Sequence, residues 1–122
     1  MKKVSIKTGM LATDLGYRDS NDMWLFKTEK GSLYGTNTRG GISGKEKTFK
    51  QPTQTELQSW LRKKGIDVYA IPTTYEGDKT YAAVLHTGDK MEYVKTGVKS
   101  YEKAIELGLK DALLILKQKK NG

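Results

Sequence analysis

His86 is the only histidine in the chain, so any chemistry that needs an imidazole would have to use it. A serine-histidine-aspartate triad would take His86 as its base, but the sequence has no G-x-S-x-G turn to hold the nucleophile. The chain has no cysteine, so a metal site would need His86 and several carboxylates, and no such cluster is visible. We therefore expect His86 at the end of a strand, facing solvent or a neighbouring side chain.

A glycine-rich stretch at residues 40–46 (GGISGKE) has the outline of a phosphate-binding P-loop. That motif requires glycine at position 39 and serine or threonine at position 46, where this chain has Arg39 and Glu46. It also needs a buried strand before it and, after it, a helix whose first N–H groups bind the phosphate. The sequence predicts neither element, and we expect no nucleotide site here.

Two carboxylate pairs, Asp19/Asp22 and Glu102/Glu106, have a spacing suited to acid–base chemistry. Such chemistry needs surroundings that shift the pKa of a carboxyl group. Glu102 and Glu106 lie four residues apart on the outward face of a predicted helix, where charge is solvated. We predict that the chain is not an enzyme, that it holds no cofactor or metal and that it has no small-molecule substrate.

Basic residues are the remaining chemical signal. The 22 lysines and arginines outnumber the 14 acidic residues, and the net charge of +8 favours contact with nucleic acid or acidic proteins. The densest groups, at residues 62–64 and 117–120, lie at predicted helix C-termini, where cations also stabilise the helix dipole. The candidate anion contacts are Arg39, Lys45, Lys47 and Lys50 in the glycine-rich loop, followed by Lys79, Lys99 and Lys103.

The hydrophobic pattern that must position these residues predicts an α+β fold in a single domain over residues 1–122. Residues 1–50 should hold a helix at 6–15, a β-hairpin made of 23–26 and 32–34, and a mobile loop at 35–50. Residues 51–122 should form an α-β-β-β-α unit with an antiparallel sheet. Its expected elements are a helix from Thr53 to Gly65, strands at 66–71, 80–86 and 91–94, and a helix from Ser100 to about Gln118.

Several core and edge positions follow from this pattern. Thr53 and Glu56 have the spacing of a capping box. The strand at 66–71 should weaken at Pro72, because proline cannot donate to the ladder, so it is either an edge strand or ends there. An edge strand is open to self-association. The residues expected in the core are Trp24 and Phe26 on the hairpin, Leu57, Trp60 and Leu61 on the first helix of the unit, and Tyr101, Ile105, Gly108, Ala112 and Ile115 on the last.

The cellular compartment is predicted from what the chain lacks. The longest apolar run, residues 112–116, is far too short to span a bilayer, and residues 4–8 offer no apolar core for a signal peptide. The absence of cysteine fits a reducing compartment. We expect no membrane contact and a cytoplasmic protein.

Residues 52–120 resemble the double-stranded-RNA-binding domain in element order, in the SYEKA start of the last helix and in the spacing of its small residues. The resemblance implies two helices on one sheet face. It also implies A-form RNA bound through the first helix, a strand–strand loop and lysines that open the last helix. The family usually has lysine where this chain has Tyr101, Glu102 and Ile105, so Lys79, Lys99 and Lys103 are the contacts that remain.

Residues 52–62 (PTQTELQSWLR), 100–109 (SYEKAIELGL) and 8–17 also look like phrases in small uncharacterised proteins of Bacteroides and their phages. That resemblance implies a phage or mobile-element origin, hence the cytoplasm of a host cell or a virion, and it implies no chemistry. Three hypotheses follow. The first is a non-enzymatic interaction module that binds a protein or a second copy of itself, the second is a nucleic-acid-binding protein, and the third is a structural component of a virion.

Overall fold

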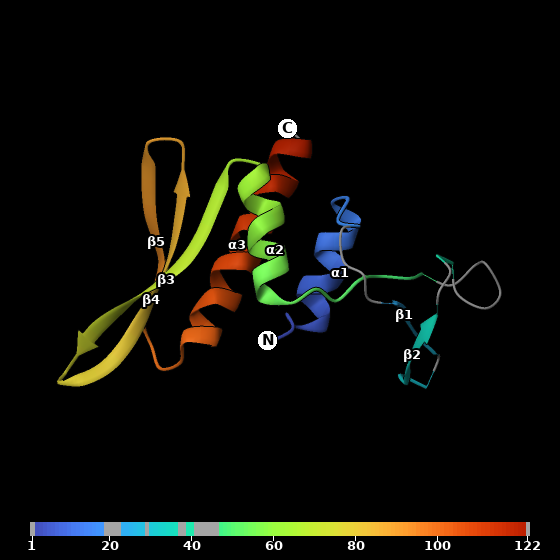
Figure 1. Ribbon diagram of the computed structural model, residues 1–122, viewed down its shortest axis with the longest axis horizontal. Coiled ribbons are helices and arrows are strands. Elements are labelled where there is room, and N and C mark those ends of the chain that lie inside the picture. The colour runs from blue at the N-terminus through green and yellow to red at the C-terminus, as the bar shows by residue number, and fades with distance from the viewer. Residues whose placement is uncertain (1, 19–22, 29, 37–38, 41–46, 122) are drawn as a thin grey trace.

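A computed structural model describes residues 2–18, 23–28, 30–36, 39–40 and 47–121 (Figure 1). The described residues form α1 (Ile6–Asp14), β1 (Trp24–Lys27), β2 (Leu33–Thr36), α2 (Gln54–Lys63), β3 (Ile66–Tyr75), β4 (Asp78–Thr87), β5 (Lys90–Val98) and α3 (Tyr101–Asn121). β1 and β2 form one antiparallel sheet, and β3, β4 and β5 form a second in that spatial order. The predicted α+β fold and its order of elements are confirmed.

The main core lies between the three-stranded sheet and the helices α2 and α3, which cover one of its faces (Figure 1). Leu57, Trp60 and Leu61 of α2 are at most 6% exposed, as their helical spacing predicted. They pack in the same cluster as Val68 of β3 and Leu109 of α3. Each such side chain contributes about 1.5–3 kcal/mol on burial, and Ala12 and Tyr17 of the N-terminal half join the same cluster.

Both helices of this unit begin at the predicted residues. The capping box of α2 is formed: Thr53 Oγ1 accepts a hydrogen bond from the N–H of Glu56 at 3.1 Å, and Glu56 Oε1 accepts one from the N–H of Thr53 at 2.8 Å. Gly65, with φ of 91°, adopts the left-handed conformation that ends a helix. At the start of α3, Ser100 Oγ accepts from the N–H of Lys103 at 2.9 Å.

α3 is the longest helix, but neither it nor another helix of the described residues is long and apolar enough to cross a membrane. It lies close to the sheet because small residues alternate with large apolar ones on its inner face. Ala112 is fully buried, and a Cβ at Gly108 would lie 2.7 Å from Cγ1 of Val68. The expectation of a buried Tyr101 was wrong. This first residue of the helix lies at the rim of the core, is 47% exposed, and makes an edge contact with the ring of Tyr81.

β3 continues past Pro72 to Tyr75, although the sequence predicted that the strand would weaken or end at the proline. It is an edge strand, as expected, with Pro72 opposite Tyr81 of β4. One side of an edge strand has no partner, so a residue without an N–H need not interrupt the ladder there. The extra length carries the β3–β4 hairpin away from the helices, at the lower left of Figure 1.

The N-terminal half is held in place by the chain segment that leads into α2. Phe49 and Leu25 exchange backbone hydrogen bonds of 2.9 Å in both directions, and the N–H of Val4 donates to the carbonyl of Pro52 at 2.9 Å. The prediction of a loop over residues 35–50 was therefore wrong at both ends. Residues 35–36 belong to β2, and Phe49, only 2% exposed, anchors the other end, while residues 41–46 lie outside the described residues.

Glu106 joins α3 to α1, contrary to the prediction that its charge would be solvated. Its carboxylate accepts a hydrogen bond from the N–H of Ser5 at 3.2 Å and another from the hydroxyl of Thr8. Ser5 is the N-cap of α1, so the carboxylate also lies at the positive end of the dipole of that helix. Glu102, one turn earlier on α3, is exposed as predicted.

Replacing Glu106 with alanine should lower the free energy of unfolding by about 1–3 kcal/mol, because the N–H of Ser5 and the buried hydroxyl of Thr8 lose a charged acceptor. The matched control, Glu102→Ala, should change it by less than about 0.5 kcal/mol. Urea unfolding followed by circular dichroism measures both variants. Equal effects of the two substitutions would contradict the role given to Glu106.

Candidate anion-binding site

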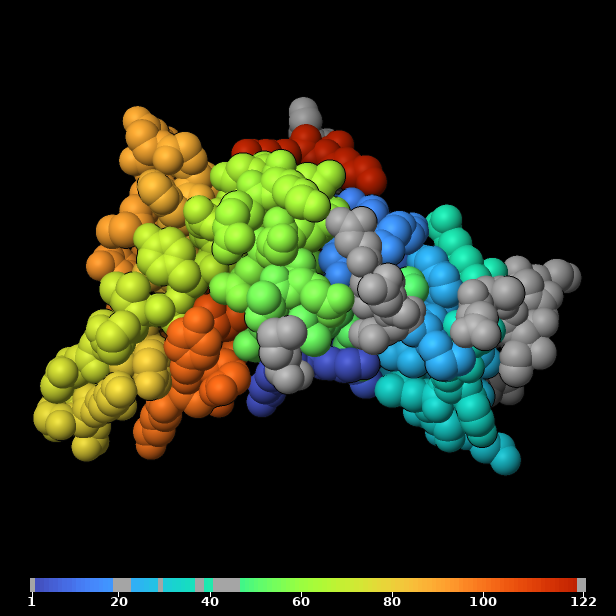
Figure 2. Space-filling view, in the orientation of Figure 1, coloured from blue at the N-terminus to red at the C-terminus, as the bar shows by residue number. Residues whose placement is uncertain are grey.

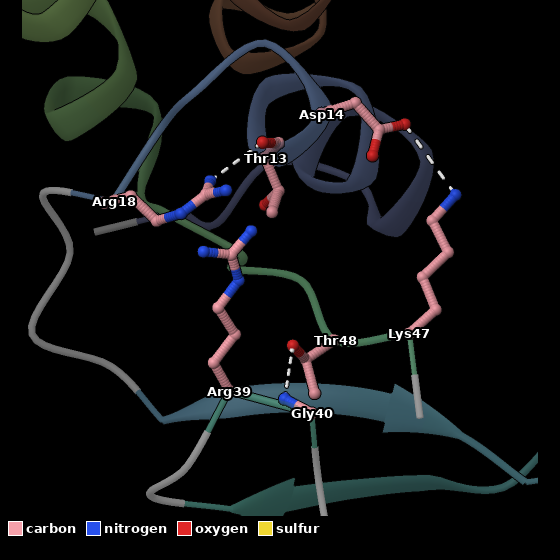
Figure 3. A pocket seen from close by; sticks show the side chains of 7 residues that line it. All are labelled: Thr13, Asp14, Arg18, Arg39, Gly40, Lys47 and Thr48. Atoms are coloured by element: carbon pink, nitrogen blue, oxygen red, sulfur yellow. Dashed lines mark hydrogen bonds and ion pairs between the residues drawn. The ribbon is translucent and has the colours of Figure 1, made fainter. Parts of the chain in front are cut away.

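A cavity of about 490 Å³ lies between the end of α1 and the chain at residues 39–40 and 47–48 (Figure 3). The described residues that line it are Thr13, Asp14, Arg18, Arg39, Gly40, Lys47 and Thr48, and we call this cavity the basic pocket. Three of these side chains are cationic, and Asp14 is the single carboxylate among them. Figure 3 shows the guanidinium groups of Arg18 and Arg39 pointing into the same space from two walls.

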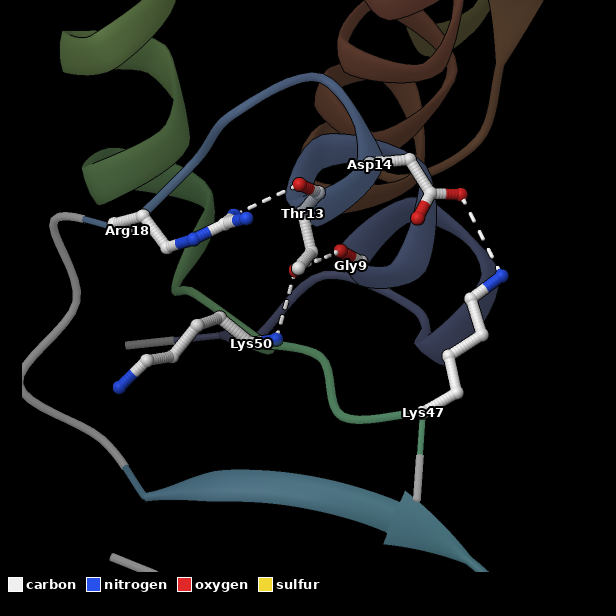
Figure 4. A network of polar contacts seen from close by, with 6 residues as sticks. All are labelled: Gly9, Thr13, Asp14, Arg18, Lys47 and Lys50. Atoms are coloured by element: carbon white, nitrogen blue, oxygen red, sulfur yellow. Dashed lines mark hydrogen bonds and ion pairs between the residues drawn. The ribbon is translucent and has the colours of Figure 1, made fainter. Parts of the chain in front are cut away.

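Arg18 is held by the turn that ends α1. Gly16, with φ of 107°, adopts the left-handed conformation there and reverses the chain. The Nη1 group of Arg18 then donates to the carbonyl oxygens of Thr13 at 2.8 Å and of Tyr17 at 2.7 Å, the first of which is drawn in Figure 4. These bonds fix the guanidinium group at the C-terminal end of α1.

The charges of the basic pocket are only partly compensated. Desolvation by burial lowers the pKa of Arg18 from its ordinary value, and the nearby Arg39 lowers it further, while Asp14 acts in the opposite direction. The carboxylate of Asp14 lies 3.8 Å from Nζ of Lys47, and both side chains are largely exposed. Since arginine stays protonated in proteins, the two guanidinium groups repel each other, and an anion between them would relieve the repulsion.

Thr13 ties α1 to the segment that carries Lys50 (Figure 4). Its Oγ1 donates to the carbonyl of Gly9 at 2.9 Å and accepts from the N–H of Lys50 at 2.8 Å. The backbones can approach this closely only because residue 9 is glycine, since a Cβ there would lie 2.5 Å from the carbonyl oxygen of Lys50. The wall formed by α1 is thus fixed against the rest of the pocket.

Trp24 lies beside the basic pocket with three cations around its ring. Nζ of Lys50 lies 4.7 Å from the ring centroid, and the guanidinium carbons of Arg18 and Arg39 lie 5.4 Å and 5.9 Å from it. Each such contact contributes about 0.5–2 kcal/mol. The sequence placed Trp24 in the core with Phe26. Phe26 is buried, but Trp24 is the first residue of β1 and is only half-buried, because its ring faces these cations.

The structure brings together three of the predicted anion contacts. Arg39 and Lys47 line the basic pocket, and Lys50 contacts Trp24 beside it. Lys45 lies outside the described residues. Sequence reasoning missed Arg18, whose only local signal was its place just after the glycine that ends α1.

The other predicted contacts lie elsewhere. Lys79 and Lys99 line a separate cavity of about 460 Å³ near the β3–β4 turn, and Lys103 is exposed on the first turn of α3. The β3–β4 turn and the β1–β2 hairpin beside the basic pocket lie at opposite ends of the longest axis of the molecule (Figures 1 and 2). Arg39 and Lys47 therefore lie in one cavity, and Lys79 and Lys99 in another at the opposite end of the molecule.

Comparison with protein-family models, with curated proteins and with solved structures found no match to this chain. Its function must be argued from the site itself. Within the described ranges, no three histidine, cysteine or acidic residues are grouped so that they could hold a metal ion, and His86 is exposed. Asp19 and Asp22 lie outside those ranges.

Replacing Thr13 with valine should lower the free energy of unfolding by about 1–3 kcal/mol, because the N–H of Lys50 loses its acceptor in a buried contact of unchanged shape. Thr55→Val, on the exposed side of α2, is the matched control and should cost less than about 0.5 kcal/mol. Urea unfolding again measures the difference. Identical transition midpoints for the two variants would show that Thr13 does not hold α1 in place.

Proposed function

We propose that this chain is a non-enzymatic binding module that binds phosphate groups of nucleic acid in the basic pocket. The observation that carries the proposal is the convergence of Arg18, Arg39 and Lys47 on one concave site that contains a single carboxylate among its described residues. Guanidinium groups donate paired hydrogen bonds to phosphate oxygens. The net charge of +8 supports the same conclusion, because it raises the local concentration of polyanions.

Nucleic acid suits the pocket better than an acidic protein does. Unpaired bases stack on aromatic rings and on guanidinium planes. The half-buried ring of Trp24 lies beside the pocket, and Arg39 is exposed at its wall. A carboxylate-rich protein surface would use the cations but would make no stacking contact with these planes.

A second candidate function, protein–protein association, is favoured by the outer face of the three-stranded sheet. Leu85 packs toward α3, so its neighbour Val84 lies on the outer face, with Tyr69 and Tyr93 as its cross-strand neighbours, and is itself buried there. Tyr93 is 56% exposed, and Met91 on the same face is 54% exposed. Apolar surface of this kind is typical of interaction sites. Light scattering that finds only monomer at high protein concentration would count against self-association through this face.

Binding to nucleic acid should weaken steeply as salt rises. If about three cations neutralise phosphate charge, log K should fall against log salt concentration with a slope near −2 on a single strand. The double variant Arg39→Ala/Lys47→Ala should bind about tenfold more weakly at low salt and show a slope that is shallower by about 1–2. Fluorescence anisotropy with a labelled single strand and its duplex measures both quantities.

The matched control is Lys79→Ala/Lys99→Ala, which removes the same charge from the other end of the molecule. It should keep most of the affinity and of the slope. A larger loss of affinity in this control would indicate that nucleic acid binds in the cavity near the β3–β4 turn. The absence of binding to either nucleic acid at low salt would end the proposal.

A further inference from the structure

The basic pocket has the form of a site for one chemical group rather than for a stretch of nucleic-acid backbone. Its volume of about 490 Å³ lies in the range of small-ligand sites. Thr13 and Arg18 form one wall, and Arg39 and Thr48 form another (Figure 3). A duplex presents its phosphates in rows on a convex cylinder, and an extended basic surface follows these rows better than a hollow does. A concave pocket can instead admit a group that projects from the end of a nucleic-acid strand.

The charge of the pocket matches a phosphate monoester. A monoester carries about −1.5 to −2 at pH 7, whereas a phosphate within the backbone carries a single charge. Both hydrogen bonds of Arg18 use Nη1, and its Nε and Nη2 have no hydrogen bond with the described residues. That edge of the guanidinium group is the one that pairs with phosphate oxygens. With Asp14 as the single carboxylate of the described lining, a doubly charged group balances the three cations better than a singly charged one.

The second group of cations lies too far from the basic pocket to form a continuous positive surface with it. Lys79 and Lys99 lie near the β3–β4 turn, at the far end of the longest axis from the β1–β2 hairpin. Figure 2 shows the two α-helices of the main core between these ends. A nucleic acid bound in the pocket is therefore held mainly at one point, which suits an end.

We infer that the basic pocket binds the terminal phosphate of a single-stranded nucleic acid, an inference that rests on the proposed function. Arg18 and Arg39 bind the monoester oxygens from two walls, and Lys47 adds a third positive charge. The unpaired base next to the phosphate has the exposed guanidinium plane of Arg39 to stack on, beside the ring of Trp24. A paired end would hold this base in the duplex and away from that plane.

The test compares single strands of one sequence, about 12 nucleotides long, that end in a 5′-phosphate, a 3′-phosphate or hydroxyl groups only. With an internal label and anisotropy as the readout, one of the phosphorylated strands should bind at least about tenfold more tightly than the hydroxyl strand. Arg39→Ala should abolish the difference, and Arg39→Lys should keep part of it, because lysine retains the charge but not the planar fork. Arg39 is exposed, so both variants should fold, which circular dichroism checks, and Lys79→Ala should keep the full difference.

The outcomes separate this inference from the proposed function. Equal binding of the three strands, weakened by Arg39→Ala, would overturn the terminal-phosphate inference and leave nucleic-acid binding in place. No binding of any strand would overturn both. A phosphoserine peptide that binds as tightly as the best strand would also overturn the inference, because the site would then read the phosphate without the nucleic acid.

Discussion

The segment at residues 49–54 is the constraint on which both halves of the molecule depend. Its backbone bonds to β1 through Phe49, to α1 through the N–H of Lys50, and to the first residues of the chain through Pro52. Because Gly9 has no Cβ, α1 lies directly against this segment. One extended stretch thus orients the hairpin and α1 relative to α2, which begins at its end, and so sets the two walls of the basic pocket.

The basic pocket places like charges beside the main core, to which α1 and the turn after it contribute Ala12 and Tyr17. The apolar cluster between α2, α3 and the sheet supplies the stability, and neither Arg18 nor Arg39 belongs to it. The repulsion between the two guanidinium groups is offset in part by the ring of Trp24 and by the carbonyl groups that bind Arg18. A local electrostatic cost of this kind, tolerated because the fold is stabilised elsewhere, is typical of binding sites.

Patterns among neighbouring residues were enough to predict the fold. The features that the sequence analysis did not predict depend on contacts between residues far apart in the chain. The capping box at Thr53 and the apolar periodicity of α2 depend on residues within a turn or two, so they could be identified without a structure. Charge alone singled out Arg39. It could not single out Arg18, which becomes part of a site only because residues 39–40 and 47–48 form the rest of the pocket around it. Glu106 was mispredicted for the same reason, since its partner Ser5 lies 101 residues away in sequence.

The separation of Ser5 and Glu106 in sequence has a consequence for the order in which the protein folds. Contacts between distant residues form late in folding, because closing a long loop costs entropy before the contact is gained. α1 rests on Glu106 of α3 as well as on Lys50, so it gains its last contacts only after α3 has been synthesised. On the ribosome, the wall of the pocket that carries Arg18 is therefore held at first without its contact to α3. The pocket that Arg18 and Arg39 form together reaches its full support only after translation has passed Glu106.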